Sequence, residues 1–253
     1  MFPGLLFSSY ERQWMAEQGN VSGKVALITG ASRGIGFAIA HRLGCMGARV
    51  AICARDRARL EEAASKLRGE GIETLAIETD VARGEEVSAL VSTTSQKLGP
   101  IDILVNNAGT GVFGPFHQFG ETEWNTVLDT NLKAVFLLSR AVAPEMIRRG
   151  TGHIINISSL AGKNTFANGA IYCASKWGLM GLTGAMAEDL RAHGIRVSAI
   201  CPGSVATDFP GQGGKAASKI LQPEDVAHAV AALVTQSEGS FISEVHIRPT
   251  RKP

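Results

Sequence analysis

The stretch Thr29-Gly30-Ala31-Ser32-Arg33-Gly34-Ile35-Gly36 decides the fold of this chain. The apolar residues 25–28 directly before it predict a short buried strand, and a helical pattern opens at Phe37 directly after it. A strand that turns through glycines into a helix points backbone N–H groups and the positive end of the helix dipole at one place. We therefore predict a phosphate-binding turn, although three nearby glycines also occur in ordinary loops.

Each glycine of this turn has its own expected function. Gly30 permits the tight turn, Gly34 lets a pyrophosphate approach the backbone, and Gly36 lets the helix pack close to the strand. Their spacing is Gly-x3-Gly-x-Gly and differs from the commoner Gly-x-Gly-x2-Gly. Ser32 and Ile35 lie between them and are expected to line the same cofactor site.

The composition indicates a globular protein and excludes several classes of partner. Of the 253 residues, 45% are hydrophobic and 19% are charged, and the net charge is +2. Neither a strong positive field nor an apolar run of about 18 residues is present, so we expect no nucleic acid and no membrane as partner. The cysteines are far apart without a Cys-x2-Cys pair, which predicts reduced thiols in a cytoplasmic protein and no metal site; they are Cys45, Cys53, Cys173 and Cys201.

Strand and helix patterns alternate to the end of the chain, with no internal repeat. The apolar runs predict strands at residues 25–29, 49–53, 74–78, 101–105, 153–157, 196–200 and 244–248. Between them the sequence predicts helices at 34–47, 57–68, 85–97, 122–149, kinked at Pro144, 171–193 and 223–235. We therefore predict a doubly wound α/β fold, a parallel sheet covered on both faces, as one domain over 23–253 after an N-terminal extension of residues 1–22.

Ligands of such sheets bind at the carboxyl ends of the strands, so the residues there identify the cofactor. An acidic residue at the end of the second strand would bind the adenosine ribose of NAD, but Ala54 and Arg55 stand there. Arg33 in the glycine turn is a second guanidinium, and arginine holds phosphate through two donors. The two arginines favour NADP(H), with its 2′-phosphate, although each taken alone could be a solvated surface residue.

The next two strands end in residues that could surround the rest of a dinucleotide. Asp80 and Val81 follow the third strand and could flank an adenine ring, or Asp80 could cap the following helix. Asn107, Ala108 and Gly109 follow the fourth strand. Their small size leaves space for a sugar and a nicotinamide, and two asparagine side chains, those of Asn107 and of Asn106 directly before it, can lock the turn. The alternative is an ordinary Asn-Gly-type turn.

Candidate catalytic groups follow the fifth strand. Tyr172 and Lys176 are four residues apart on a predicted helix and share a face. A free tyrosine has a pKa of about 10, and an ammonium group roughly 4 Å away would lower it by up to about three units. We expect a tyrosine that exchanges protons near neutral pH. A core tyrosine and a surface lysine at this spacing by chance are the alternative.

These pieces together resemble the short-chain dehydrogenase/reductase family over about residues 22–236. The matching positions, in identity, order and spacing, are the glycine turn, Asp80, Asn107-Ala108-Gly109, Asn131, Ser159, Tyr172, Lys176 and Pro202-Gly203. The resemblance implies a Rossmann-type parallel sheet of about seven strands with helices on both faces. It also implies a homotetramer or a homodimer.

The resemblance assigns a role to each catalytic position. Tyr172 looks like the general acid that protonates the substrate oxygen as a hydride arrives from the nicotinamide. Lys176 would lower the tyrosine pKa and bind the nicotinamide ribose, while Asn131 would hold a water in a proton relay from Lys176. Ser159 would polarise the carbonyl, with Ser158 pointing elsewhere. The segment expected to close on the nicotinamide contains Pro202, Gly203, Val205 and Thr207.

Within the family the chain is most similar to 3-oxoacyl-[acyl-carrier-protein] reductases and the carbonyl reductases near them. The predicted reaction is hydride transfer from NADPH to a ketone or aldehyde, either a 3-oxoacyl thioester or a related small carbonyl. Arg148, Arg149 and Arg191 could meet an acidic carrier protein, or could complement the dipoles of their helices. Residues 208–222 are short and rich in Gly, Ala and Lys, which predicts an open site, and the unusual end at 247–253 weakens the prediction of a tetramer.

Two other functions stay open. The first is an NAD(P)-dependent dehydrogenase that oxidises a secondary alcohol, a sugar or a steroid; Arg33 and Arg55 argue against a preference for NAD. The second is a non-enzymatic NADP-binding protein on the same fold. The intact set of Asn131, Ser159, Tyr172 and Lys176 argues against it, because a pure binder has no use for all four.

Overall fold

The computed structural model describes residues 21–210, 220–237 and 239–251. The predicted N-terminal extension therefore lies outside the described residues except at its end, and so does most of the predicted open loop at 208–222. Val21 is fully buried in the core, and its carbonyl oxygen accepts a hydrogen bond of 3.0 Å from the Lys24 N–H. The packed part of the described chain thus includes the last residues of the predicted extension.

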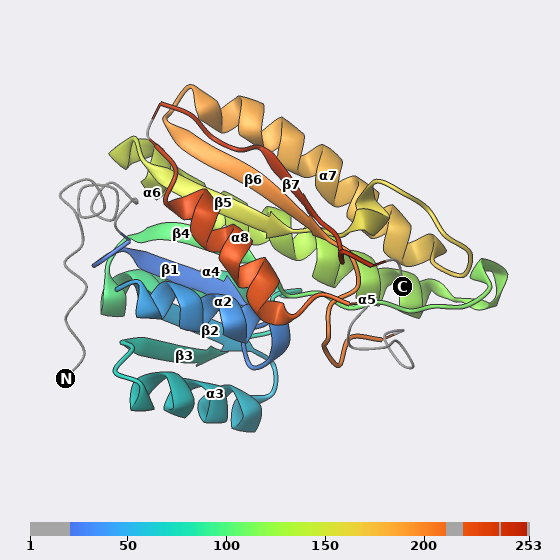
Figure 1. Cartoon of the computed structure of the whole chain (residues 1–253), viewed down its shortest axis with the longest axis horizontal. Coiled ribbons are helices and arrows are strands. Elements are labelled where there is room, and N and C mark those ends of the chain that lie inside the picture. The colour runs from blue at the N-terminus through green and yellow to red at the C-terminus, as the bar shows by residue number, and fades with distance from the viewer. Residues whose placement is uncertain (1–20, 211–219, 238, 252–253) are drawn as a thin grey trace, which may run out of the picture.

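Seven parallel strands form one sheet in the order β3-β2-β1-β4-β5-β6-β7 (Figure 1). The chain builds outward from β1 to β3 and then returns to place β4 on the other side of β1. Ligands of doubly wound sheets bind at this reversal of strand order. The predicted fold class is confirmed. The strands are β1 (Val25–Thr29), β2 (Arg49–Ala54), β3 (Thr74–Glu78), β4 (Ile101–Asn106), β5 (Gly152–Ile157), β6 (Ile195–Pro202) and β7 (Glu244–Ile247).

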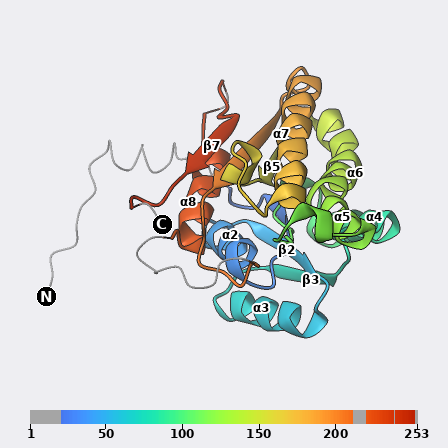
Figure 2. The ribbon, with the colours of Figure 1, turned by 90° about the vertical axis from the view of Figure 1, so that its right-hand side faces the viewer.

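Helices cover both faces of the sheet, as Figure 2 shows from the side. Ala26 and Ile28 of β1 belong to an apolar cluster with the helices of one face, whereas Val25 and Leu27 pack with the helices of the other. Burial on both faces explains why β1 is a continuous apolar run rather than an alternating one. The first face carries α2 (Gly34–Cys45), α3 (Arg57–Gly69) and α8 (Pro223–Val234); the second carries α4 (Gly84–Leu98), α6 (Ala134–Arg149) and α7 (Ala170–Arg191).

The long helix predicted at 122–149 is the main departure from the predicted elements. It consists of α5 (Glu121–Leu128), the π turn η2 (Asp129–Lys133) and α6. The π turn was not predicted, and Pro144, where the kink is expected, lies inside α6. The other predicted boundaries agree with the structure within two residues, and short 3-10 turns occur at η1 (Phe116–Gln118) and η3 (Leu160–Gly162).

Two further predictions concern the surface and the thiols. None of the helices in the described part of the chain has the length and apolar character needed to cross a membrane. All four cysteines are free thiols, and Cys45 is the exposed one. Burial raises the pKa of the Cys53 thiol to about 12 and that of Cys201 to about 11, so both stay protonated at neutral pH.

Candidate active site

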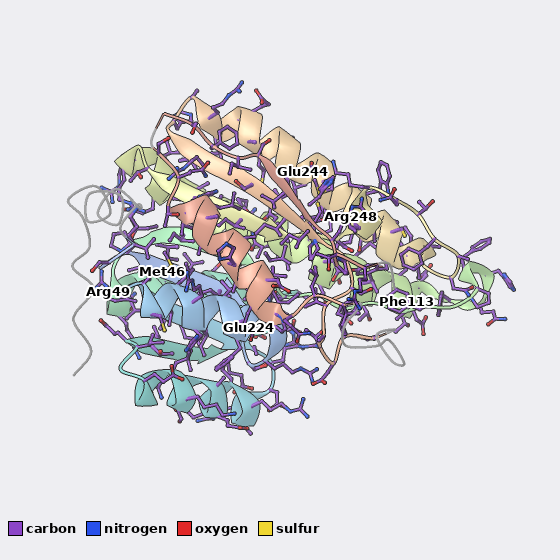
Figure 3. All side chains as sticks on the ribbon, in the orientation of Figure 1. Met46, Arg49, Phe113, Glu224, Glu244 and Arg248 are labelled. Carbon is purple, nitrogen blue, oxygen red and sulfur yellow. The ribbon has the colours of Figure 1, made fainter. Side chains whose placement is uncertain are left out.

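A cavity of about 1640 Å³ runs along the carboxyl ends of the strands, at the end of the molecule where Figure 3 labels Phe113 and Arg248. All of the predicted site residues line it except Gly36 and Asn131. Pockets for a single drug-sized ligand usually measure about 300–1,000 Å³. This cavity is therefore large enough for an extended cofactor together with a second molecule.

The glycine turn is held by close backbone approaches. Gly30 has a φ of +63°, and a Cβ there would lie 2.8 Å from the Ala108 Cα. A Cβ on Gly36 would lie 2.5 Å from the Gly30 carbonyl oxygen and from Asn107 Nδ2. The turn after β1, the start of α2 and the turn after β4 can meet only because these side chains are absent, which agrees with the roles expected for the two glycines.

The start of α2 suits a phosphate group. Its N-cap is Arg33, and its first turn contains no acidic residue, so no carboxylate neutralises the positive end of the helix dipole. The first N–H groups of a helix have no acceptor within it and can bind an anion. Gly34 has a φ of +57°, and a Cβ there would lie 3.2 Å from Thr207 Cγ2. The loop after β6 therefore closes against the same turn.

Asn107 and Thr29 tie the first two turns together. Asn107 Nδ2 donates to the carbonyl oxygens of Thr29 at 2.8 Å and Gly30 at 3.1 Å. Thr29 Oγ1 accepts from the backbone N–H groups of Asn107 and Ala108, both at 3.0 Å. The prediction that the two asparagines lock the turn is thus correct for Asn107 and wrong for Asn106, whose buried Nδ2 donates to Asn156 Oδ1 at 2.8 Å. Thr29 was not singled out from the sequence, although it is the hydroxyl residue that ends β1.

The adenosine end of the cavity is rich in guanidinium groups. Arg33 and Arg55 both line the cavity, as predicted, and Arg59 lines it as well. Asp56, which follows Arg55, accepts a hydrogen bond of 3.1 Å from the Arg59 N–H as the N-cap of α3 and also pairs with the Arg59 side chain. Arg33 forms an exposed ion pair of 2.7 Å with Asp208, which lies in the loop after β6. An anion at Arg33 would have to compete with that carboxylate.

Asp80 and Val81 lie in the cavity wall next to the adenosine end. Asp80 Oδ1 accepts a hydrogen bond of 3.1 Å from the Ala82 N–H, and the Asp80 N–H donates to Glu86 at 2.7 Å. The N-cap of α4 is Arg83 rather than Asp80. The alternative in which Asp80 caps the helix is therefore wrong, and its carboxylate stabilises the turn that leads into α4.

The three candidate catalytic side chains lie together at the end of the cavity away from the arginines; they are Ser159, Tyr172 and Lys176. Tyr172 and Lys176 come from α7, and Ser159 follows β5; the Tyr172 hydroxyl is hydrogen-bonded to Ser159. Lys176 Nζ donates to the carbonyl oxygen of Ile157 at 2.9 Å and lies 5.9 Å from the centre of the Tyr172 ring. The spacing of thirteen residues between Ser159 and Tyr172 thus brings the serine, and not Ser158, to the phenol.

The pKa of the tyrosine differs from the expectation. Burial raises the pKa of Tyr172 to about 12, and the hydrogen bond with Ser159 offsets this only in part. Burial also lowers the pKa of Lys176 to about 8. The expected net lowering of the tyrosine pKa is therefore wrong for this structure, because burial outweighs the interactions that lower the pKa. Desolvation is the reason, because it favours the neutral form of both side chains.

Asn131 supports the site from behind the cavity wall. Its side chain is 1% exposed and bonds to Thr110 in both directions: Oδ1 accepts from the Thr110 N–H, and Nδ2 donates to the Thr110 carbonyl oxygen, both at 2.8 Å. Nδ2 also donates to Ser175 Oγ at 3.0 Å. Both side-chain N–H donors are therefore in use, and the amide joins the π turn, the loop after β4 and α7. Thr110 and Ser175 were not singled out from the sequence.

The three arginines considered for a carrier protein each pair with a carboxylate of their own chain. Arg148 pairs with Glu145 and Arg191 with Glu188, while Arg149 binds Asp102 at 2.6 Å. Their placement supports the simpler interpretation, in which they complement helix ends.

Sequence reasoning also missed three phenylalanines around Tyr172, namely Phe113, Phe166 and Phe209. They come from three different loops, and no local pattern marks them as neighbours.

Comparison with known proteins decides the family. The sequence profile of the short chain dehydrogenase family matches residues 24–217. The chain belongs to this family. The expected membership and the expected oxidoreductase class are therefore confirmed, and the matched range ends before residue 236, where the resemblance was expected to stop.

Three similar proteins illustrate the relationship. A metagenomic short-chain oxidoreductase solved in complex with NADP is 47% identical, with a TM-score of 0.82 over 92% of this chain and 100% of that chain. The putative ketoacyl reductase 1 of granaticin polyketide synthase from Streptomyces violaceoruber is 43% identical over 76% of this chain and 71% of its own length. Glycine betaine reductase ATRR from Emericella nidulans is 34% identical over 98% of this chain, which spans only 22% of that relative.

Proposed function

We propose that this short-chain dehydrogenase/reductase uses NADP(H) to reduce the carbonyl group of a ketone or aldehyde, with Tyr172 as general acid. The observation that carries the proposal is that Ser159, Tyr172 and Lys176 line the same cavity as the glycine turn, with Lys176 Nζ 5.9 Å from the centre of the tyrosine ring. Because burial raises the pKa of Tyr172 to about 12, its phenol is protonated at neutral pH. A protonated phenol is ready to donate to a carbonyl oxygen, which favours the reductive direction.

The side chains divide the work around the substrate carbonyl. The bound cofactor supplies the hydride. Ser159 and Tyr172 hold the carbonyl oxygen, and the phenol donates its proton as negative charge develops there. Lys176 lies beneath the ring, and its ammonium group would stabilise the phenolate that remains.

Asn131 acts in this scheme as a positioning residue. Its two side-chain donors are already bonded to Thr110 and Ser175, so the amide fixes the loop after β4 and the start of α7. A π turn is a common irregularity at functional sites, and here it presents Asn131 to both neighbours. The proposed proton relay would therefore depend on Asn131 for its geometry.

NADP(H) is the cofactor that fits the adenosine end. Three arginines line this end of the cavity, namely Arg33, Arg55 and Arg59. The acid in the loop after β2, Asp56, already accepts from the Arg59 N–H and pairs with the Arg59 side chain. A 2′-phosphate would find guanidinium donors there, whereas a ribose 2′-hydroxyl of NAD would find no acidic acceptor at the end of β2. The metagenomic relative was solved with NADP, which supports the same choice.

A small-molecule carbonyl fits the site better than a carrier-bound thioester. Arg148, Arg149 and Arg191 are paired within the chain and offer little free positive charge to an acidic carrier protein.

We also expect a homodimer or homotetramer in the cytoplasm. Half-exposed aromatic side chains on α5, α6 and α7 support self-association; they are Trp124, Phe136 and Trp177.

The test is the loss of NADPH absorbance with a panel of ketones, diketones, quinones and a 3-oxoacyl thioester, with NADH as the paired control. We expect turnover of small ketones with NADPH and at least tenfold lower kcat/KM with NADH. Secondary alcohols with NADP+ and NAD+ test the oxidative alternative. Absence of turnover with every carbonyl compound while NADPH still binds would overturn the proposal and favour the non-enzymatic alternative.

A further inference from the structure

Two phenylalanine rings contact the ring of Tyr172, and a third stacks on one of them. Phe113 from the loop after β4 and Phe209 from the loop after β6 each lie with their ring centres 5.5 Å from that of Tyr172. Phe166, from the loop between β5 and α7, stacks on Phe113 at 6.2 Å and an interplanar angle of 29°. We call these three phenylalanines the aromatic wall. Aromatic pairs prefer separations of about 4.5–7 Å, so the rings already sit in favourable contact with one another.

The absence of a side chain at Gly111 leaves room for the rings of Phe113 and Phe209. A Cβ on Gly111 would lie 3.0 Å from the Phe113 ring and 3.1 Å from the Phe209 ring. Both distances are tighter than ordinary contacts, so any larger residue at this position would push the two rings apart. Figure 3 labels Phe113 at the end of the molecule where the strands finish, and Phe113 lines the cavity.

The wall is uncharged, in contrast with the adenosine end of the cavity. The cavity residues next to the rings are Asn164, Thr165, Ala167 and Pro210. Asp208 precedes Phe209 but is paired with Arg33. Lys176 Nζ, the cation beneath the tyrosine ring, is already hydrogen-bonded to the Ile157 carbonyl oxygen, so the three rings offer a substrate apolar contact rather than a counter-charge.

We infer that the substrate is an uncharged ketone carrying an aromatic ring, which packs against the aromatic wall while its carbonyl meets Tyr172 and Ser159. The inference rests on the proposed carbonyl reduction. Phe166 is 49% exposed, so part of its ring remains available to a ligand. One aromatic contact strengthens binding by about 2- to 12-fold beyond the area that it buries. A saturated ring of the same size lacks the edge-to-face component of that contact.

Two ketones with equal carbonyl reactivity test this inference. In 4-phenylbutan-2-one and 4-cyclohexylbutan-2-one, two methylene groups separate the ring from the carbonyl, so the carbonyl groups themselves are matched. We expect the purified full-length protein with NADPH to show about tenfold higher kcat/KM for the phenyl ketone, mainly through a lower KM. A ratio near one would overturn the inference and leave the proposed carbonyl reduction intact.

Substitutions in the aromatic wall test whether its rings cause the preference for the phenyl ketone. Phe113→Leu and Phe209→Leu keep an apolar side chain but remove the ring, and we expect each to reduce the phenyl-to-cyclohexyl ratio to below about three. Phe37→Leu is the matched control, because Phe37 lies on α2 and stacks on His41, away from the wall. A ratio that persists in both wall variants would contradict the inference. Absence of turnover with both ketones while NADPH binds would contradict the proposed function and the inference together.

Discussion

The glycine turn and the aromatic wall lie in one cavity, yet they are built in opposite ways. The turn is eight consecutive residues that act through their backbone, and two of its glycines are required because nothing larger fits. The wall consists of side chains brought together from three loops. The difference teaches that cofactor binding in this protein follows from a local segment, whereas substrate choice follows from tertiary structure.

The same contrast predicts how each region responds to substitution. A Cβ in the turn collides with backbone atoms that cannot move cheaply, so the effect is large and general. A change in the wall alters which ligands pack well and leaves the backbone in place.

Gly30→Ala should have the largest effect. The alanine Cβ would approach the Ala108 Cα to 2.8 Å, and the φ of +63° is unfavourable for any side chain. Strain and overpacking together should lower the free energy of unfolding by about 2–5 kcal/mol, and we expect the Kd for NADPH to rise at least 100-fold. Urea unfolding and fluorescence titration measure the two quantities.

Gly69→Ala is the control for that substitution. Gly69 is the last residue of α3, and a Cβ there meets nothing within 4 Å. Its free energy of unfolding should change by less than about 1 kcal/mol, with NADPH binding unchanged. Equal behaviour of the two alanine variants would remove the steric basis of the comparison.

The pH dependence of reduction should report Lys176. With pKa values of about 8 for Lys176 and about 12 for Tyr172, raising the pH first removes the ammonium proton while the phenol keeps its own. Because the protonated lysine is the active form, kcat/KM should fall about tenfold per pH unit above pH 8. Stopped-flow rates with NADPH between pH 6 and 10 measure it, and a profile that is flat to pH 10 would refute this role of the ammonium group.

Arg33→Ala and Arg55→Ala should separate the two cofactors. Each should raise the Kd for NADPH by about 5- to 20-fold, because a charge-assisted hydrogen bond to the 2′-phosphate is lost at an exposed site. The Kd for NADH should stay within twofold. Arg42→Ala, at the opposite end of α2, is the control and should change neither value. Parallel losses for NADPH and NADH would instead indicate general damage to the turn.

Asp208→Asn should give the smallest effect, and it should raise the affinity for NADPH rather than lower it. It removes the carboxylate that competes for Arg33 at 2.7 Å. Since exposed ion pairs are weak, the gain in NADPH affinity should be only about two- to fivefold. The gain should disappear in the Arg33→Ala background. A loss of affinity would show that Asp208 orders the loop over the cofactor rather than competing with it.

The local parts of this site could be predicted from the sequence. The turn from Thr29 to Gly36 and the spacing of Ser159, Tyr172 and Lys176 are short-range patterns, and the parallel, doubly wound sheet follows from the alternation of strands and helices. Asn107 was correctly expected to lock its turn, because an asparagine directly after a buried strand has few other partners.

What the sequence missed depends on contacts between distant segments. The π turn gives Asn131 its partners Thr110 and Ser175, which are 21 and 44 residues away. Helical periodicity cannot reveal one inserted residue of this kind. The prediction of a lowered tyrosine pKa was wrong for the same reason, since the spacing to Lys176 can be read from the sequence but the desolvation around Tyr172 cannot.

The central claim is that the Tyr172 hydroxyl donates the proton to the substrate carbonyl. Its most direct test is the single-turnover rate of 4-phenylbutan-2-one reduction by NADPH bound to the Tyr172→Phe variant, compared with the wild type at pH 7. The change deletes one oxygen atom and keeps the ring that packs between Phe113 and Phe209. We predict a rate about 10³-fold lower with the Kd for NADPH within threefold of the wild-type value. A rate within tenfold of the wild type would contradict the claim.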